Sequence, residues 1–246
     1  MGILRIGATA GRRQREPDRL LNAVHYSERM ADARGGRRLT RDDVAAAALR
    51  LLDEHGLPDL TMRRLGAALD VQPSALYWHY PDKQTLLAAV ADRIVAGAAR
   101  HRGGADAPGD ATAAIRDQAS ALRLALLAHR DGAEVVASTT ALGLGAADAR
   151  DALAAAVAGA GFAAGAADRA ADALLHFVLG HVTHEQQRTQ LARLGVIAAD
   201  EHRGGDARDG FDFGIDLLVR GLASLSGRET GSGVGPAGLE PTTSTV

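Results

Sequence analysis

Apolar residues recur at intervals of three and four along most of this chain, which is the spacing of one face of an α-helix. The first clear run lies between Thr40, a preferred N-cap residue, and Gly56, a residue type that often ends helices. Its apolar residues share one face of the predicted helix: Val44, Ala47, Ala48, Leu51 and Leu52. The pattern therefore predicts an amphipathic helix between residues 40 and 56.

Three further helices are predicted before residue 102, each with its own start signal. Two starts are N-cap side chains and one is a proline at the first helical position. The start residues and their helices are Thr61 with 62–69, Pro73 with 73–80 (ended by Pro81) and Asp82 with 83–100. Helical runs also follow residue 102, and they are predicted over 110–129, 132–141, 146–160, 166–188 and 208–225, with a loop over 195–207.

The composition agrees with these helices. Hydrophobic residues make up 46% of the 246 residues but aromatic residues only 3%, and Ala and Leu dominate. Both are strong helix formers, so the predicted fold class is all-α. There is no cysteine, and no stretch approaches the roughly 20 apolar residues that a membrane span needs. A cytoplasmic protein without a membrane segment is expected.

These patterns divide the chain into four parts. The first is a flexible basic arm, with Met30 as an alternative start, and the last is a disordered tail rich in Gly, Pro and Thr. Between them lie two helical domains. The predicted boundaries are 1–38, 39–102, 103–226 and 227–246.

Charge is distributed unevenly between the two halves. Residues 1–102 carry 17 basic and 12 acidic side chains, whereas residues 103–246 carry 11 basic and 18 acidic ones. A positive N-terminal part on a negative remainder is typical of a nucleic-acid-binding domain attached to a domain that does not touch phosphate.

A short helix, a tight turn and a second short helix over 61–80 have the spacing of a helix-turn-helix, in which the second helix enters the major groove. The alternative is that Tyr77, Trp78 and Tyr80 merely fill a small core. Neighbouring helical positions point about 100° apart, so three aromatic residues within four positions cannot all face inward. At least one of them is expected to be exposed.

The run over 39–95, LTRDDVAAAALRLLDEHGLPDLTMRRLGAALDVQPSALYWHYPDKQTLLAAVADRIV, resembles the DNA-binding domain of the TetR family. The segments LRLALLAHRDGAEVV, LLHFVLGHVTHEQQ and FDFGIDLLVRGL resemble the ligand domain of the tetracycline-binding members. The resemblance implies a regulator that binds double-stranded operator DNA. The DNA contacts that it implies are Thr61, Arg63, Pro73, Ser74, Ala75, Tyr77, Trp78, His79 and Lys83.

The resemblance also implies a ligand pocket, but with a different lining. Where tetracycline-binding members use a His and an Arg, this chain has Val136 and Thr140, and His184 stands where they use a Glu of the partner subunit. The expected ligand is therefore an organic molecule other than magnesium–tetracycline, with no cofactor. The implied pocket residues are Gln118, Leu122, Val136, Thr140, Phe177, His181 and His184.

Two features invite other interpretations. His181 and His184 lie three residues apart and could share one helix face, with His176 off that face, but a polar pocket lining or an interface hydrogen bond is favoured over a metal site. The tetrapeptide HRDG at 129–132 occurs in kinase catalytic loops, yet the rest of that signature is missing. We expect Asp131 to cap the next helix and Arg130 to form an interdomain salt bridge.

The sequence thus predicts a one-component transcriptional regulator. The resemblance implies a repressor that binds a palindromic operator as a homodimer through helices at 166–188 and 208–225 and is released by a small-molecule inducer. Two rival classes remain: a nucleoid- or RNA-binding module without a ligand, and an α-helical enzyme. No nucleophile, base and orienting group are spaced for the enzyme, so none is expected.

Overall fold

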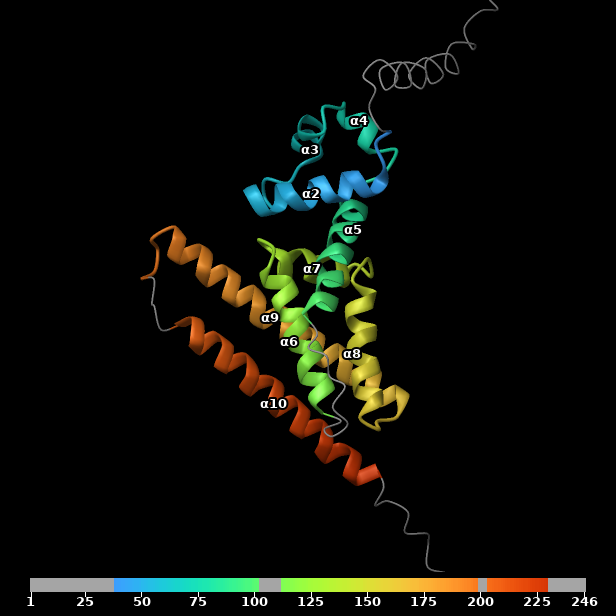
Figure 1. The fold of residues 1–246 in the computed structure, drawn as a ribbon, viewed down its shortest axis with the longest axis vertical. Helices are drawn as coiled ribbons and strands as arrows, with labels where there is room; N and C mark the ends of the chain where they lie inside the picture. Colours follow the sequence, from blue (N-terminus) through green and yellow to red (C-terminus); the bar gives the residue numbers. More distant parts are fainter. Residues whose placement is uncertain (1–37, 102–111, 199–202, 230–246) are drawn as a thin grey trace, which may run out of the picture. The chain divides into compact units, whose positions relative to one another are not determined.

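The computed structural model describes residues 38–101, 112–198 and 203–229. The chain divides into two units, residues 1–40 and 41–246, and residues 38–40 have no regular secondary structure. The described part of the second unit is all-α (Figure 1). Its helices are α2 (Arg41–His55), α3 (Met62–Ala68), α4 (Pro73–Leu76), α5 (Lys83–Ala96), the 3-10 turn η1 (Gly97–Arg100), α6 (Ala113–Leu127), α7 (Gly132–Ala141), α8 (Ala147–Gly159), α9 (Ala164–Arg193) and α10 (Arg203–Glu229).

Helices α2, α3 and α4 form a small N-terminal bundle, here called the head. The Thr61 hydroxyl accepts a hydrogen bond from the Arg64 amide (3.1 Å) and caps α3, as predicted. Pro73 occupies the first turn of α4, also as predicted. Between α3 and α4 the chain turns tightly, because the Val71 amide donates to the Gly66 carbonyl (2.9 Å). A Cβ at Gly66 would lie 2.9 Å from the Val71 carbonyl oxygen, so this turn requires glycine.

Helix α4 is shorter than the predicted segment 73–80. It ends at Leu76, and the amides of His79 and Tyr80 both donate to the Leu76 carbonyl (2.9 Å each). Pro81 disfavours helical backbone at Tyr80, so the chain leaves the helix before it. Tyr80 is buried, and its hydroxyl donates to the Arg41 carbonyl at the start of α2 (3.0 Å). This contact closes the head.

Helix α5 connects the head to the remaining helices, α6–α10, here called the body. It packs against α2 in the head and against α6, α7 and α8 in the body. The Asp92 carboxylate of α5 accepts a hydrogen bond from the Ala146 amide (2.6 Å), which precedes α8. At Gly145 (φ +65°) a Cβ would lie 2.8 Å from the Ala88 carbonyl oxygen, so the turn between α7 and α8 rests directly on α5. Helix α5 therefore links α7 and the turn after it to the head.

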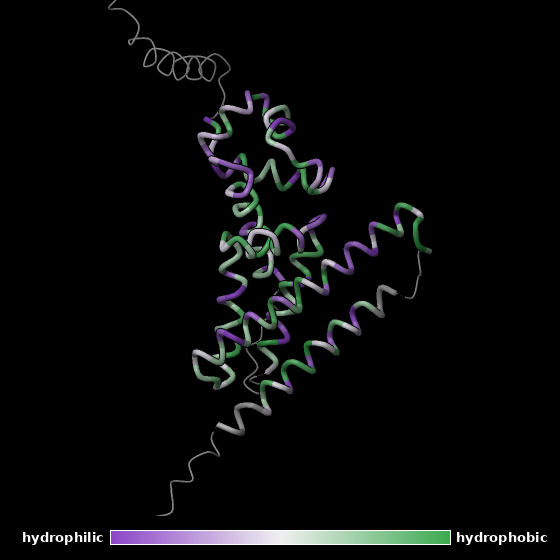
Figure 2. Tube along the Cα trace, turned by 180° about the vertical axis from the view of Figure 1, so that it is seen from behind, coloured by the Kyte–Doolittle hydropathy of each residue, from purple (hydrophilic) through white to green (hydrophobic). Residues whose placement is uncertain are grey.

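Helix α9 is the central element of the body and packs against α6, α7, α8 and α10. Figure 2 shows hydrophobic and hydrophilic residues alternating along α9 and α10, as in amphipathic helices. The predicted loop over 195–207 is wrong at its end, because α10 begins at Arg203. The reason is tertiary: the Ala207 carbonyl accepts a hydrogen bond from His181 Nε2 of α9 (2.9 Å), and Phe211 is fully buried against the body.

We expect the Asp82 cap of α5 to make the stability of the head depend on pH. Hydrogen bonds from the amide and then the hydroxyl of Thr85 lower the pKa of the Asp82 carboxyl. A carboxyl with a depressed folded-state pKa stabilises the fold above its unfolded pKa, and this stabilisation is lost as the pH falls through the folded-state pKa. The melting temperature of Asp82→Ala should lie below that of the wild type at neutral pH, and the difference should vanish in acid. A difference that does not change with pH would contradict this role.

Candidate DNA interface and effector site

The three aromatic residues after Leu76 are not all buried, as the sequence predicted. Tyr80 is only 2% exposed and belongs to the core of the head, whereas Tyr77 is 49% and Trp78 80% exposed. The Trp78 indole therefore does not serve to fill the core of the head. Indole N–H and phenol O–H groups on a helix-turn-helix can donate hydrogen bonds to DNA phosphates.

The other predicted contact residues lie on the same part of the head, at α3, α4 and the first residue of α5. Thr61, Arg63 and Ser74 are exposed, whereas Pro73, Ala75, His79 and Lys83 are half-buried. Arg63 and Lys83 have no ion-pair partner among the described residues, while the neighbouring Arg64 pairs with Asp59 (3.1 Å). Two cations at this site are therefore available to phosphate.

Gln72 is a candidate base-reading residue that the sequence reasoning missed. It is exposed and takes the N-cap position of α4, but its side chain makes no capping hydrogen bond. A glutamine amide can form paired hydrogen bonds with adenine in the major groove. Its position directly before Pro73 was the signal that could have identified it.

The structure does not bring the seven predicted ligand residues together in one cavity. Gln118, Leu122 and Val136 are buried in the body. Phe177 and His181 face α10, where their ring centroids lie 5.7 and 5.4 Å from that of Phe211.

Thr140 and His184 border a cavity of about 430 Å³ between α7 and α9. Its other polar lining residues are His176, Thr183 and Gln187, and its floor is formed by small or apolar residues. No lining residue carries a carboxylate, an ammonium or a guanidinium group. Such a cavity suits an uncharged organic molecule with hydrogen-bonding groups.

The two predicted pocket residues His181 and His184 lie in different environments. His181 Nε2 donates to the Ala207 carbonyl on α10, while His184 borders the cavity beside α7 together with His176. Helix α9 packs against α7 on one side and α10 on another, and the two histidines contact different neighbours. Within the described ranges, no three His, Asp or Glu side chains gather at a metal-binding distance.

The HRDG segment joins the body to the head, but not in the expected way. Asp131 occupies the N-cap position of α7 with a left-handed backbone (φ 54°), but its side chain makes no capping hydrogen bond. Its carboxylate instead accepts a hydrogen bond from the Leu57 amide in the head (2.8 Å). Arg130 forms no salt bridge there but donates to the Glu54 carbonyl (3.3 Å). A side-chain hydrogen bond across this junction joins His129 Nδ1 to the Asp53 carboxylate (3.1 Å).

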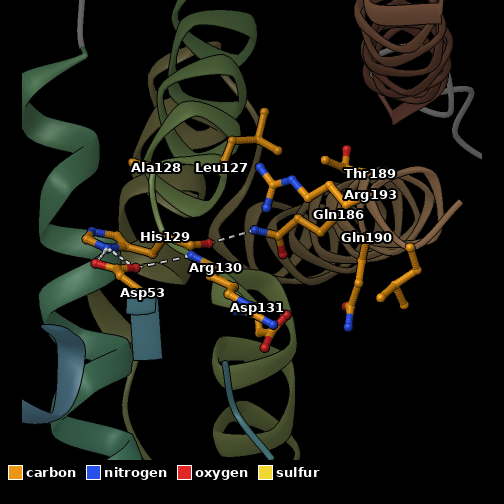
Figure 3. Close-up of a pocket in the computed structure, with 11 residues that line it drawn as sticks. Asp53, Leu127, Ala128, His129, Arg130, Asp131, Gln186, Thr189, Gln190 and Arg193 are labelled. Atoms are coloured by element: carbon orange, nitrogen blue, oxygen red, sulfur yellow. Dashed lines mark hydrogen bonds and ion pairs between the residues drawn. The ribbon is translucent and has the colours of Figure 1, made fainter. Parts of the chain in front are cut away.

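Gln186 of α9 holds the HRDG segment from the other side. Its amide nitrogen donates to the carbonyls of Leu126 (3.1 Å) and His129 (2.8 Å), and its oxygen accepts from the Ala133 amide (3.2 Å). One side chain thus satisfies the backbone at the end of α6 and at the start of α7. The segment between the two helices is fixed to both α9 and the head (Figure 3).

A buried ion pair that the sequence reasoning missed lies next to the aromatic cluster. Arg123 Nη2 donates to both carboxylate oxygens of Glu185 (2.9 and 2.8 Å), and its guanidinium lies 5.3 Å from the centroid of the Phe211 ring. The two residues are 62 positions apart, so no local sequence signal pairs them.

Two family models match the chain. Residues 33–90 match the model for bacterial regulatory proteins of the tetR family, and residues 104–199 match the tetracyclin repressor-like C-terminal domain. Similar curated proteins include the tetracycline repressor protein class E of Escherichia coli, which is 32% identical over 197 residues. That alignment covers 76% of this chain and 92% of the repressor.

Solved structures give the same result. BioQ of Mycobacterium smegmatis is 41% identical with a TM-score of 0.67, and the match covers 76% of this chain and 99% of BioQ. A structure of BioQ with its natural double-stranded DNA operator is 40% identical with a TM-score of 0.62 and the same coverage of both chains. With a helix-turn-helix head, a tetracyclin repressor-like body and repressors among its relatives, this chain belongs to the TetR family of bacterial regulatory proteins.

Proposed function

We propose that this chain is a one-component transcriptional repressor. It binds a palindromic operator as a homodimer and is released by a small-molecule inducer other than magnesium–tetracycline. The observation that carries the proposal is the exposure of Tyr77 and Trp78 directly after a helix-turn-helix recognition helix. The operator-bound structure of the relative BioQ supports the same docking mode.

Within this proposal the nine predicted contacts have different roles. Tyr77, Trp78, His79 and Lys83 bind phosphates and fix the register of the head on the duplex. Pro73, Ser74 and Ala75 face base edges, together with Gln72, while Thr61 and Arg63 meet the backbone beside the groove. Small side chains at the start of α4 allow a close approach to the bases.

Exposed apolar residues on α10 support the homodimer. Phe213 and Leu217 lie one helical turn apart, and they are 66% and 56% exposed. Paired with α9 and α10 of a second copy, this face would be buried. Two heads one helical turn of DNA apart then read a palindrome.

The proposed inducer shifts a population between two arrangements of α7. Because α7 packs on α5 and the turn after α7 rests on Ala88, a ligand against Thr140 and His184 can displace α5 and the head. The ligand must bind the released state more tightly than the DNA-bound state, or no shift occurs. Val136 and Thr140 lack the metal-binding and charged groups that a magnesium–tetracycline complex requires.

In vitro selection of DNA fragments on the purified chain, followed by footprinting, tests this proposal. We expect a palindromic site with two half-sites one helical turn apart.

Trp78→Ala should weaken binding to this operator by about tenfold or more through loss of a phosphate contact, with no change in melting temperature. Leu142→Ala is the matched control, because it removes an exposed apolar side chain of the body (55% exposed).

The opposite results are equally clear. Binding without sequence preference that disappears steeply with salt would leave only a basic surface and reject the repressor. Unchanged operator affinity in Trp78→Ala would remove the assigned role of the exposed indole.

A further inference from the structure

A second cavity, of about 590 Å³, lies where the body meets the head (Figure 3). Asp53 of α2 forms the wall that belongs to the head. The segment joining α6 and α7 contributes Arg130 and Asp131, and α9 contributes Gln190 and Arg193. This cavity is separate from the one at Thr140 and His184, with which it shares no lining residue.

The two carboxylates that line this cavity already accept hydrogen bonds from other parts of the protein. The Asp53 carboxylate accepts hydrogen bonds from His129 Nδ1 (3.1 Å) and from the Arg130 amide (3.2 Å). The Asp131 carboxylate accepts from the Leu57 amide (2.8 Å). Both carboxylates therefore already accept hydrogen bonds from within the protein.

The donor groups, in contrast, are largely unused. The Arg193 guanidinium and the side-chain amide of Gln190 form no hydrogen bond or ion pair within the described part of the chain. Among the described residues the Arg130 guanidinium has one hydrogen bond, from Nη1 to the Glu54 carbonyl (3.3 Å), and its other N–H groups have no partner there. In Figure 3 Arg193 projects from α9, on the wall away from Asp53 and Asp131.

We propose that this junction cavity binds a small organic oxyanion, a carboxylate or a phosphate ester, through Arg193 and Arg130. Guanidinium groups bind these anions with paired, charge-assisted hydrogen bonds. Leu127 and Leu194 supply apolar wall for the carbon part of the ligand. The cavity is large enough for a molecule of metabolite size.

Binding here is coupled to the head, because Arg130 already holds the Glu54 carbonyl of α2 and its amide holds Asp53. An anion that engages Arg130 changes the strength of these two contacts. By linkage, operator DNA and the anion must then alter each other's affinity by the same factor. The cavity is thus an effector site distinct from the proposed inducer site.

Isothermal titration of the full chain without DNA tests the proposal, with citrate and inorganic phosphate as separate probes against sodium chloride of equal ionic strength. We expect saturable binding of at least one probe, and the preferred probe identifies the anion as a carboxylate or a phosphate. Arg193→Gln should weaken this binding by about tenfold or more. Gln190→Glu should also weaken it, by pairing Arg193 with a new carboxylate.

Arg169→Gln is the matched control, since it removes an exposed arginine near the opposite end of α9 and should leave the affinity unchanged. Arg193 is exposed, so its variant should keep the wild-type melting temperature without anion. No saturable heat with either probe, or equal affinity in Arg193→Gln, would overturn the proposal. Because no DNA is present, either result leaves the operator proposal untouched.

Discussion

Replacing Arg123 by alanine is expected to destabilise the chain by about 3–5 kcal/mol. The Arg123 side chain is 7% exposed and that of Glu185 is 20% exposed, so the substitution leaves a largely buried carboxylate without its cation. It also removes the guanidinium that covers the Phe211 ring. Urea unfolding followed by circular dichroism measures the loss as a lower transition midpoint at an unchanged slope.

A double variant separates the ion pair from the packing. Arg123→Met with Glu185→Leu keeps apolar volume at both positions and removes both charges. Because a buried ion pair carries a desolvation cost, we expect this variant to recover most of the lost stability. Arg123 Nε has no hydrogen-bond partner in the described structure, which adds to that cost. A loss below about 1 kcal/mol in Arg123→Ala would mean that solvent screens the pair as it does at a surface.

The second large effect is expected at the contact between α9 and α10. A Cβ at Gly214 would lie 2.2 and 2.6 Å from Cζ and Cε2 of the Phe177 ring. That ring is held by Phe211 and His181, so it cannot simply turn away. We expect Gly214→Ala to force α10 away from α9 and to cost about 1–3 kcal/mol, measured by urea unfolding.

Gly221→Ala provides a control on the same helix. Nothing lies within 4 Å of the position that its Cβ would take. Alanine favours helix over glycine, so this variant should gain up to about 1 kcal/mol. The two substitutions are chemically identical, and opposite signs would show that close packing on Phe177 decides the effect. Equal gains in both variants would show that α10 packs loosely on α9.

Short-range signals predicted much of the head. Thr61 and Asp82 are caps because their side chains reach the amides three residues ahead, and this depends only on the local sequence. The rule that successive helical residues point in different directions required at least one exposed aromatic residue, and both Tyr77 and Trp78 are exposed. Helical periodicity and a composition rich in Ala and Leu predicted the all-α fold class, and the TetR resemblance, carried by 39–95 and three later segments, predicted the family.

Contacts between residues far apart in the chain were not predictable in this way. Asp131 was expected to cap α7 but bonds to Leu57, which is 74 residues away. His181 was predicted to line one pocket with His184, but it bonds to Ala207 of α10 while His184 borders the cavity beside α7. The start of α10 at Arg203 was missed because the segment before 208 has no helical apolar pattern of its own and is held by α9.

The sequence by itself therefore determined the helices, the caps of the head, the exposed aromatic residue and the family. These properties arise from interactions within about one helical turn, which a linear pattern records. Only the tertiary structure decided which polar groups meet: Arg123 with Glu185, and His129 with Asp53. It also placed Arg193 and Gln190 beside a cavity, with no side-chain partner among the described residues. Such meetings depend on how helices pack against one another, and helix packing brings together residues whose separation in the chain carries no periodic signal.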